Sequence, residues 1–473
     1  MGQPLVTGSG EAELRAVVEE ARERARRLRR PIVASLTVAA DPSLDVTAAV
    51  FASRAAEERY FAWEQPEREG FAIGALGAAW TIERSGFDRF ERAAEECTEA
   101  LFGAVIEGES EPTASGPTWV GGFAFAPDGG ATPEWASFAP GLLVLPSVLL
   151  TRHGDAAGAT VNVVCRGEDD VEAACRGALA RLAALQPASM PLVDPDPVAG
   201  YEISSTLPPE IYEQAVAKAV ETIREGAFEK VVLAREVQVD APAPFKPPAV
   251  FDALRTGYPS CYCFCVGTPE AAFVGASPEL LVRREGARLS TVALAGSTRR
   301  SADPAVDDHL GERLLHSAKD LGEHAIVVRT IERALEPLSV WVTPAEEPVL
   351  IKVANIQHLA TPLRAQLAEP RSVVELAGAL HPTSAVGGEP WPQAAEAIDR
   401  LEEMDRGWYA GPIGWMDATE DGELCVALRC ALLQGRTARC YAGVGVVGDS
   451  DPEAELAETE IKLLAVMPAL TGS

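Results

Sequence analysis

The chain has 473 residues, 47% of them hydrophobic and 23% charged, so it is long enough to bury a large core and to form a globular protein. Its formal net charge of −29 excludes the nucleic-acid-binding proteins, because a phosphate backbone requires a basic surface. No apolar run approaches the roughly 20 residues of a membrane span. The first residues also lack the basic segment followed by an apolar segment that is typical of a signal peptide. We therefore expect a cytoplasmic protein without a membrane partner.

The N-terminal part, residues 1–198, is predicted to be scaffold. It combines a helix from Glu11 to Arg30 with short strands such as Trp119 to Phe125, and it has few residues with chemical functions. The stretch from Gln186 to Val198 contains four prolines and indicates a linker or a surface crossing. Residues 199–473 hold the candidate catalytic residues, and we expect both parts to form one integrated unit.

A strand with a lysine at its head follows a predicted helix that ends near Gly226. The two-residue period of a strand places Lys230, Val232 and Ala234 on one face, so an ammonium group heads an otherwise apolar row. Burial could lower the pKa of this lysine by the roughly three units, from about 10.4, that a base near pH 7 requires. The alternative is a strand-end lysine that reaches water.

The nine cysteines are scattered and odd in number, which excludes a secreted disulfide framework. Cys261, Cys263 and Cys265 alternate with aromatic and apolar residues along a strand. A zinc site needs two intervening residues and a turn, so we predict buried, free thiols.

The segment from Gly275 to Glu279 partly resembles the nucleophile elbow of serine hydrolases. Pro278 follows the serine, however, and proline lacks the N–H that the elbow's oxyanion hole requires. Glu279 enters the apolar strand that begins at Leu280, where burial would raise its pKa toward the range of a general acid. A solvated turn glutamate is the alternative.

Two acidic couples have helical spacing: Asp320 with Glu323, and Glu455 with Glu458. Residues three apart on a helix share a face, so each couple points two carboxylates the same way. Four such groups could hold one hard cation. Alternatively, both couples lie on solvated helix faces, as most acidic pairs do in so acidic a chain.

Apolar stripes predict the helices that carry these couples. The second helix begins at Asp451-Pro452, an N-cap residue followed by proline at the first helical position, and Glu455, Glu458 and Lys462 share one of its sides. The stripes themselves are predicted to be Leu310, Leu314, Ala318, Leu321, Ala325 and Val328 within residues 304–335, and Ala457, Ile461 and Leu464 in the second helix.

The stretch from Gly443 to Gly448 matches the dinucleotide motif GxGxxG and is predicted to lie between a strand and a helix. Acidic residues crowd the helix start where a pyrophosphate would sit, and only 25 residues remain after Gly448, too few to complete a βαβ unit. We therefore expect these glycines to let a ligand approach the backbone, and not to bind a nucleotide.

Several of these segments together resemble the chorismate-binding enzymes, which include isochorismate, salicylate, anthranilate and aminodeoxychorismate synthases. The resemblance covers about residues 200–467 and reaches the N-terminal half only loosely. The segments that carry it, in order, are Lys230 to Arg235, Ala276 to Leu280, Leu294 to Ser297, Lys319-Asp320 with Glu323-His324, His358 to Pro362, His381 to Thr383, Tyr409 to Gly414, Arg429, and Glu458-Thr459 with Lys462.

The resemblance implies an α+β fold of the anthranilate synthase component I type, with two large antiparallel sheets, peripheral helices and a cleft between them. The isochorismate synthases are the branch that this sequence resembles most. They are isomerases, and the resemblance implies that Lys230 activates water for attack at C2 of chorismate while Glu279 protonates the departing C4 hydroxyl.

The resemblance also implies a magnesium site and a substrate site. Glu323 and Glu458 would ligate Mg²⁺, with Asp320 and Glu455 in support. Chorismate is a dianion, so the metal and a guanidinium would neutralise its two carboxylates locally within an acidic protein. His316 and His324 could bind zinc, but an all-oxygen ligand set favours Mg²⁺. The implied substrate-binding residues are Gly296 and Ser297 at the ring carboxylate, His358, and Tyr409, Arg429 and the Gly443 backbone at the enolpyruvyl carboxylate.

Some alternatives remain open in the sequence. A lysine that activates water argues against a glutaminase subunit, which anthranilate synthases use to supply ammonia, and we expect a monomer. Salicylate synthases share Lys230 and Glu279 and then expel pyruvate, although the stretch Leu359 to Pro362 favours isochorismate as the product. A metal-dependent hydrolase and an idle anion-binding protein are the alternatives from other classes. The sequence does not choose between menaquinone and siderophore pathways.

Overall fold

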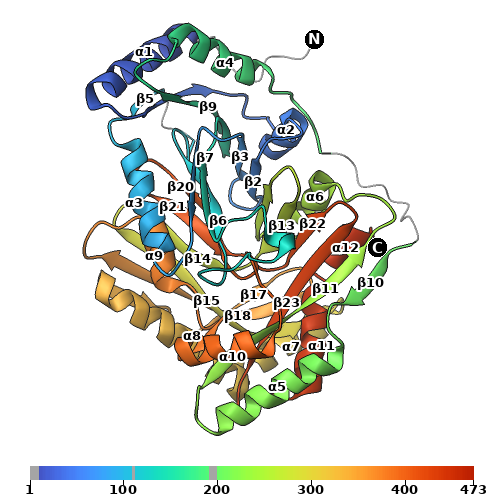
Figure 1. Ribbon diagram of the computed structural model, residues 1–473. Helices are drawn as coiled ribbons and strands as arrows, with labels where there is room; N and C mark the ends of the chain where they lie inside the picture. The colour runs from blue at the N-terminus through green and yellow to red at the C-terminus, as the bar shows by residue number, and fades with distance from the viewer. Residues whose placement is uncertain (1–9, 109–111, 191–199, 473) are drawn as a thin grey trace.

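Two large β-sheets organise the chain in the computed structural model, which describes residues 10–108, 112–190 and 200–472 (Figure 1). Within these residues every strand pair is antiparallel except β1 with β5. Sheet 1 has the order β10 (Glu202–Ser205), β11 (Lys230–Asp240), β23 (Thr437–Val446), β22 (Cys430–Gln434), β13 (Ala272–Ser277), β12 (Tyr262–Gly267), β2 (Tyr60–Gln65), β3 (Phe71–Leu76), β8 (Val148–His153), β9 (Ala156–Cys165), β1 (Ile32–Ala39) and β5 (Val105–Gly108), and β19 (Gly388–Glu389) also pairs with β11.

Sheet 2 is the smaller of the two. Its order is β16 (Ser339–Pro344), β18 (Ile356–Leu367), β15 (Arg288–Arg299), β14 (Leu280–Glu285), β21 (Gly422–Val426), β20 (Pro412–Met416), β6 (Trp119–Phe123), β7 (Gly141–Leu145) and β4 (Trp80–Arg84), and β17 (Val349–Lys352) also pairs with β18. This architecture confirms the predicted α+β class.

Helices cover the outer surfaces and the ends of the sheets. They are α1 (Glu11–Leu28), α2 (Val46–Ser53), α3 (Arg89–Leu101), α4 (Val171–Ala183), α5 (Pro209–Arg224), α6 (Pro247–Gly257), α7 (Pro304–Leu315), α8 (Ala318–Leu335), α9 (Val373–Leu380), α10 (Trp391–Leu401), α11 (Pro452–Leu463) and α12 (Met467–Thr471), with 3-10 turns at Pro133–Trp135 and Glu336–Leu338. Among the residues described, no helix has both the length and the apolar character that crossing a bilayer requires.

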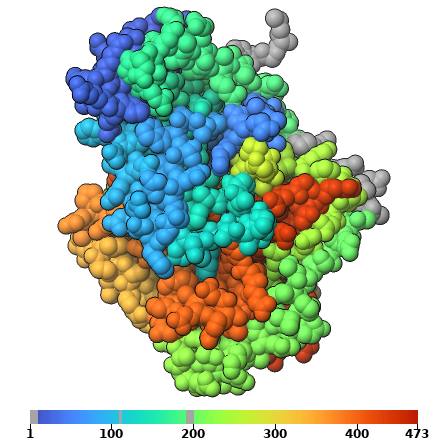
Figure 2. Space-filling model, viewed as in Figure 1, coloured from blue at the N-terminus to red at the C-terminus, as the bar shows by residue number. Residues whose placement is uncertain are grey.

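Strands from both parts of the chain share each sheet. In sheet 1, β12 pairs with β2, and in sheet 2, β20 pairs with β6. Figure 2 shows the same intermixing at the surface, where N-terminal residues in blue and cyan lie directly against later segments in orange and red. The predicted helix at Glu11 and strand at Trp119 are present, and each ends two residues early. Most of the proline-rich stretch, residues 191–198, lies outside the described residues.

Large aromatic side chains fill the space between the sheets. Trp63 and Phe71 of sheet 1 are fully buried with Trp119 of sheet 2, and the rings of Phe71 and Trp415 lie 5.8 Å apart. A second apolar cluster lies between sheet 1 and helices α1, α2, α6 and α12. It includes the three alternating cysteines, and all nine cysteines are free and buried, as predicted for those three.

The predicted apolar stripe within residues 304–335 is wrong beyond its first turns. The chain breaks at His316, and the Ser317 hydroxyl accepts a hydrogen bond from the Asp320 amide to start a new helix, α8. This break resets the helical phase, so Ala318 and Ala325 are exposed. The buried side of α8 consists of His324, Val327, Ile331 and Leu335.

The predicted apolar side of α11 is also wrong. Ala457 and Leu464 are exposed, and the helix buries Glu455, Thr459 and Leu463 instead. The reason is its position: α11 packs on β23 of sheet 1, whereas α8 packs on β15 of sheet 2. The polar sides of both helices therefore turn inward, toward a space between the two sheets.

Candidate active site

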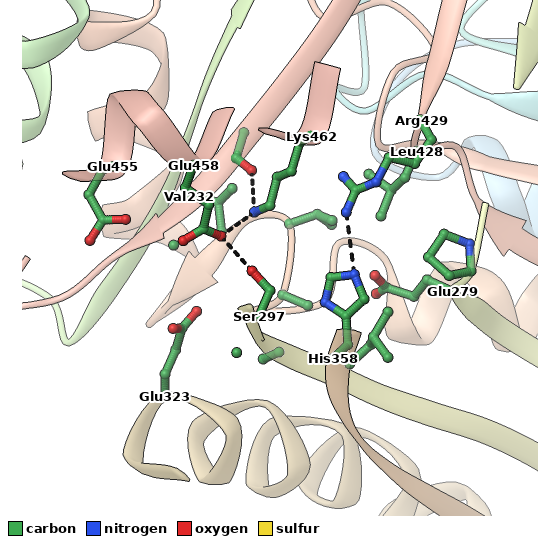
Figure 3. A pocket seen from close by; sticks show the side chains of 18 of the residues that line it. Val232, Glu279, Ser297, Glu323, His358, Leu428, Arg429, Glu455, Glu458 and Lys462 are labelled. Carbon is green, nitrogen blue, oxygen red and sulfur yellow. Dashed lines mark hydrogen bonds and ion pairs between the residues drawn. The ribbon is translucent and has the colours of Figure 1, made fainter. Parts of the chain in front are cut away.

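A hollow of about 830 Å³, which includes its opening to solvent, lies where α8, α11 and strands of both sheets meet. Both acidic couples line it, so two segments that are distant in sequence converge as predicted. Figure 3 shows the carboxylates of Glu323 and Glu458 on one side of this hollow and Arg429 with Glu279 on the other. The other predicted residues that line it are Asp320, Glu455, Gly296, Ser297, His358, Tyr409 and Gly443.

Lys230 lies immediately behind this lining. It is the first residue of β11, its side chain is only 1% exposed, and its Nζ is 2.9 Å from Glu323 Oε1. The backbone of Lys230 is fixed by pairing with Glu389 of β19. The lysine therefore does not reach bulk water, and its ammonium is held by a carboxylate of the neighbouring sheet's helix.

Glu279 is buried in the short connection between β13 and β14. Its backbone amide donates to the Ser277 hydroxyl at 3.2 Å, and its carbonyl accepts from the Val426 amide at 3.0 Å. Burial raises the pKa of Glu279 to about 8, even though the charges of Lys230 and Arg429 act to lower it. Glu279 is thus a protonated acid at neutral pH and does not lie in a solvated turn.

The remaining carboxylates of the hollow are held mostly by lysines. Glu458 Oε1 is 2.8 Å from Lys462 Nζ and accepts a hydrogen bond from Ser297 at 2.9 Å. Burial would raise the pKa of Glu458, but the Lys462 ammonium and the Ser297 hydroxyl outweigh it and hold the pKa below its usual value. Glu455 is paired with Lys319 at 3.2 Å.

Negative charge is in excess at this end of the hollow. Burial and the nearby carboxylates of Glu323 and Glu458 raise the pKa of Asp320, and burial together with Glu458 raises that of Glu455. Such mutual repulsion between carboxylates is relieved when a cation binds between them. These oxygen donors therefore suit a hard divalent cation.

The carboxylates do not yet surround a common point. Among residues 10–108, 112–190 and 200–472, no three His, Cys, Asp or Glu side chains stand close enough together to hold a metal ion. Histidine is not a candidate ligand here, because both ring nitrogens of His324 are hydrogen-bonded, to the Ala295 carbonyl and to Thr361, and the His316 side chain is 77% exposed. A bound cation would draw on the second carboxylate oxygens of Glu323 and Glu458, because Lys230 and Lys462 each contact Oε1.

The opposite end of the hollow is formed by Arg429 and His358. Arg429 lies in a left-handed conformation (φ 50°) between β21 and β22, and its Nε is buried without a hydrogen-bond partner among the described residues. Its Nη2 donates to His358 Nε2 at 3.3 Å. Burial, together with the charges of Arg429 and Lys462, lowers the pKa of His358 to about 3, so the imidazole is neutral. A guanidinium with a free buried donor is suited to bind an anion.

Tyr409, Gly443 and Gly296 complete the lining. Tyr409 stacks on Tyr441 with ring centroids 5.3 Å apart, and Lys462 Nζ donates to the Gly443 carbonyl at 2.9 Å. Gly296 adopts φ +76° at a bulge in β15, and an added Cβ there would lie 3.3 Å from the Asp320 side chain. The bulge lets the chain turn Ser297 toward Glu458.

Three lining residues with polar side chains had no predicted role. Lys319 and Lys462 belong to the motifs quoted above, and the helical spacing of Glu458 and Lys462 could have indicated their pairing. Tyr441 had no signal in the sequence, since only the fold brings it against Tyr409. The GxGxxG stretch also differs from expectation: Gly443 and Gly445 lie within strand β23, not in a turn after it.

A family model described as chorismate binding enzyme matches residues 18–471. The chain belongs to the chorismate-binding enzyme family. This confirms the predicted family and the prediction of an enzyme, and it extends the resemblance through the N-terminal half, which the sequence motifs covered only loosely.

Relatives over nearly the full length support the same assignment. The salicylate biosynthesis isochorismate synthase of Pseudomonas aeruginosa is 38% identical over 97% of this chain and 94% of its own length. The isochorismate synthase MenF of Bacillus subtilis is 36% identical over 87% of this chain and 88% of its own length. Among solved structures, the menaquinone-specific isochorismate synthase MenF of Escherichia coli superposes with a TM-score of 0.78 at 27% identity, covering 96% of this chain and 100% of its own.

The fold extends to a more distant member. Anthranilate synthase component I from Streptococcus pneumoniae superposes with a TM-score of 0.65 over 84% of this chain and 92% of its own, at 21% identity. At that identity the likeness concerns the fold alone. The predicted anthranilate synthase component I type of fold is confirmed.

Proposed function

We propose that this protein is an isochorismate synthase, an isomerase that adds water at C2 of chorismate and releases the C4 hydroxyl as water. The observation that carries the proposal is Glu279, a buried carboxyl with a pKa of about 8 that shares one hollow with Arg429 and with Glu323, the ion-pair partner of Lys230. A carboxyl that stays protonated at neutral pH can donate a proton to a departing hydroxyl. The full-length relatives named isochorismate synthase support the same reaction.

The reaction needs one base and one acid. Lys230 first gives up its ammonium proton and then, as the amine, takes a proton from the attacking water as its oxygen bonds to C2. Both conjugated double bonds of the ring shift by one position, the C4–O bond breaks, and Glu279 gives its proton to the leaving hydroxyl, which departs as water. Atoms balance, because one water enters and one leaves. Transfer of a proton from Lys230 back to Glu279 then restores both groups. Each proton transfer contributes roughly 10²- to 10⁴-fold to the rate.

Substrate orientation is the role of the remaining polar groups. Chorismate carries two carboxylates, and the open Nε of Arg429, near the Tyr409 ring and the Gly443 backbone, is suited to the enolpyruvyl carboxylate. Gly296, Ser297 and His358 lie toward the ring carboxylate. Because His358 is neutral, it can accept from Arg429 and hold this donor in place without adding charge. Fixing a single substrate in a reactive orientation is itself a large part of catalysis.

Magnesium completes the proposed site. Glu323 and Glu458 would hold the ion, with Asp320 and Glu455 in support, and the raised pKa values of the two supporting carboxylates favour this assignment. When bound, Mg²⁺ supplies the positive charge that holds the ring carboxylate in an acidic protein.

No other subunit is needed for this chemistry. The nucleophile is water, so a glutaminase that delivers ammonia has no role, and every proposed residue comes from one chain. We propose a monomer on this ground.

The decisive experiment incubates the purified protein with chorismate and Mg²⁺ and resolves the products by chromatography, with a coupled assay for pyruvate. We expect isochorismate to accumulate without pyruvate, and isochorismate supplied as substrate to return chorismate. Pyruvate released in step with chorismate loss would show a salicylate synthase instead. Chorismate that remains untouched would indicate a hydrolase of another substrate or an idle binding protein.

A further inference from the structure

Gly445 touches the Lys230–Glu323 pair from strand β23. A Cβ added at Gly445 would lie 2.3 Å from Glu323 Oε1 and 2.8 Å from Lys230 Cε, both far inside van der Waals contact. The backbone does not require glycine here, because Gly445 lies outside the left-handed region and pairs regularly with Val232 of β11. The missing side chain therefore serves only to leave room, and two charged side chains use that room.

The other two glycines of the same stretch behave differently. A Cβ at Gly443 would meet the Tyr409 hydroxyl at 3.0 Å and backbone and Cβ atoms at slightly longer distances, a tight but adjustable contact. A Cβ at Gly448 would meet Ile223 at 3.6 Å, which is ordinary contact. Of the three, Gly445 alone makes a severe clash, and the clash is with candidate catalytic atoms.

We infer that Gly445 is a positioning residue whose empty side-chain space lets the Glu323 carboxylate reach the Lys230 ammonium. The inference rests on the proposed function, in which Lys230 is the base. A methyl group at this position forces Oε1 to retreat by about 1 Å before contact becomes ordinary. Glu323 and the end of Lys230 are flexible, so they move and the fold does not. The pair separates while the strand stays in place.

The first test compares Gly445→Ala with Gly322→Ala. Gly322 is exposed and lies next to Glu323 on α8, and beyond its chain neighbours and its own helix backbone an added Cβ would have no described atom within 4 Å. It therefore controls for a methyl group added near the pair. At saturating Mg²⁺ we expect Gly445→Ala to lower kcat about 10²-fold, the loss typical of a reacting group misplaced by 1 Å. The KM for chorismate and the melting temperature should stay close to wild type, and Gly322→Ala should retain full activity.

The second test asks whether the added methyl acts through the carboxylate. Glu323→Asp shortens the side chain by one methylene and withdraws the carboxylate from the clash. A double-mutant cycle should then show strong coupling: Gly445→Ala should lower kcat by less than about twofold in the Glu323→Asp background. Equal losses in both backgrounds would overturn the inference.

A crystal structure of Gly445→Ala gives a readout that does not depend on activity. We expect Lys230 Nζ and Glu323 Oε1 to lie beyond hydrogen-bond distance, compared with 2.9 Å in the wild type. An unchanged distance would overturn the inference. If the wild-type protein does not convert chorismate, the proposed function fails, yet this structure still decides whether Gly445 positions the pair.

Discussion

Two buried charge clusters in this molecule are built in different ways. The first lies at the interface of the sheets, where the fully buried Glu423 of β21 accepts hydrogen bonds from Gln65 at 2.7 Å and Arg68 at 2.8 Å and is also paired with Arg283. One carboxylate is thus enclosed by two guanidinium groups and an amide. Both carboxylate oxygens have fixed donors and the charge is fully compensated, so we call this cluster saturated, and it offers no uncompensated charge to a ligand.

The second cluster is the site between α8 and α11. Here the four carboxylates of the two couples face three lysines, Lys230, Lys319 and Lys462, and several of the carboxylates repel one another. An ammonium is a point charge on a flexible stem, so these pairs can be exchanged for a cation or a substrate more readily than arginine forks can. Buried charge therefore marks a functional site where it is incompletely compensated, and a structural one where it is saturated.

Removing the proposed base should have the largest effect on activity. We expect Lys230→Ala to lower kcat by roughly 10²- to 10⁴-fold, because the general base is lost. The free energy of unfolding should change little, since the side chain's partner, Glu323, has access to solvent and can rehydrate. Steady-state kinetics and thermal unfolding check this, with the exposed Lys218→Ala as the matched control. Wild-type turnover in Lys230→Ala would refute the base assignment.

The affinity for Mg²⁺ should fall in a Glu455→Gln variant, by a smaller factor than kcat falls in Lys230→Ala. Glu455 is proposed to support the Mg²⁺ site without ligating the ion directly, so Glu455→Gln should weaken Mg²⁺ binding by about 10- to 100-fold. Isothermal titration with Mg²⁺ measures this directly, and saturating metal should restore most of the activity. Glu460→Gln, an exposed change on the same helix, is the control. Unaltered Mg²⁺ affinity in Glu455→Gln would remove that residue from the site.

The pH dependence of the reaction should report Glu279. A general acid works only when protonated, and the pKa of about 8 means that the acid form prevails below pH 8 and is lost as the pH rises through that value. We expect kcat/KM for chorismate to be about tenfold lower at pH 9 than on its plateau near neutrality. The residual activity of Glu279→Gln should lack this decline. A wild-type profile that stays flat to pH 9 would contradict the assignment.

The sequence was informative where local chemistry determines structure. The strand at Lys230 follows from strand periodicity, and the buried position of Glu279 follows from the apolar strand that begins at Leu280; both are present. The face of α8 was predicted wrongly because the chain breaks at His316 and the new helix resets the phase. The face of α11 was predicted wrongly because hydrophobic periodicity assumes an apolar core. Helix α11 instead buries Glu455 and Thr459 against a charged hollow. The contact of Gly445 with Glu323 joins strands and helices far apart in the chain, and no local pattern encodes it.

Glu423→Gln tests most directly whether the saturated cluster is only structural. It should have the smallest effect on catalysis of the substitutions proposed. The substitution leaves Arg68 and Arg283 without their carboxylate. We expect a loss of about 3 kcal/mol in the free energy of unfolding. This value is at the lower end of the range for broken buried ion pairs, because each arginine side chain is 26% exposed. Urea unfolding measures this loss, and kcat per folded molecule should equal wild type. Because Lys230→Ala is expected to do the reverse, the two variants separate the clusters by function. A Glu423→Gln protein that stayed stable but lost turnover would mean that the saturated cluster also serves the reaction, and that incomplete compensation of charge is not what distinguishes the site.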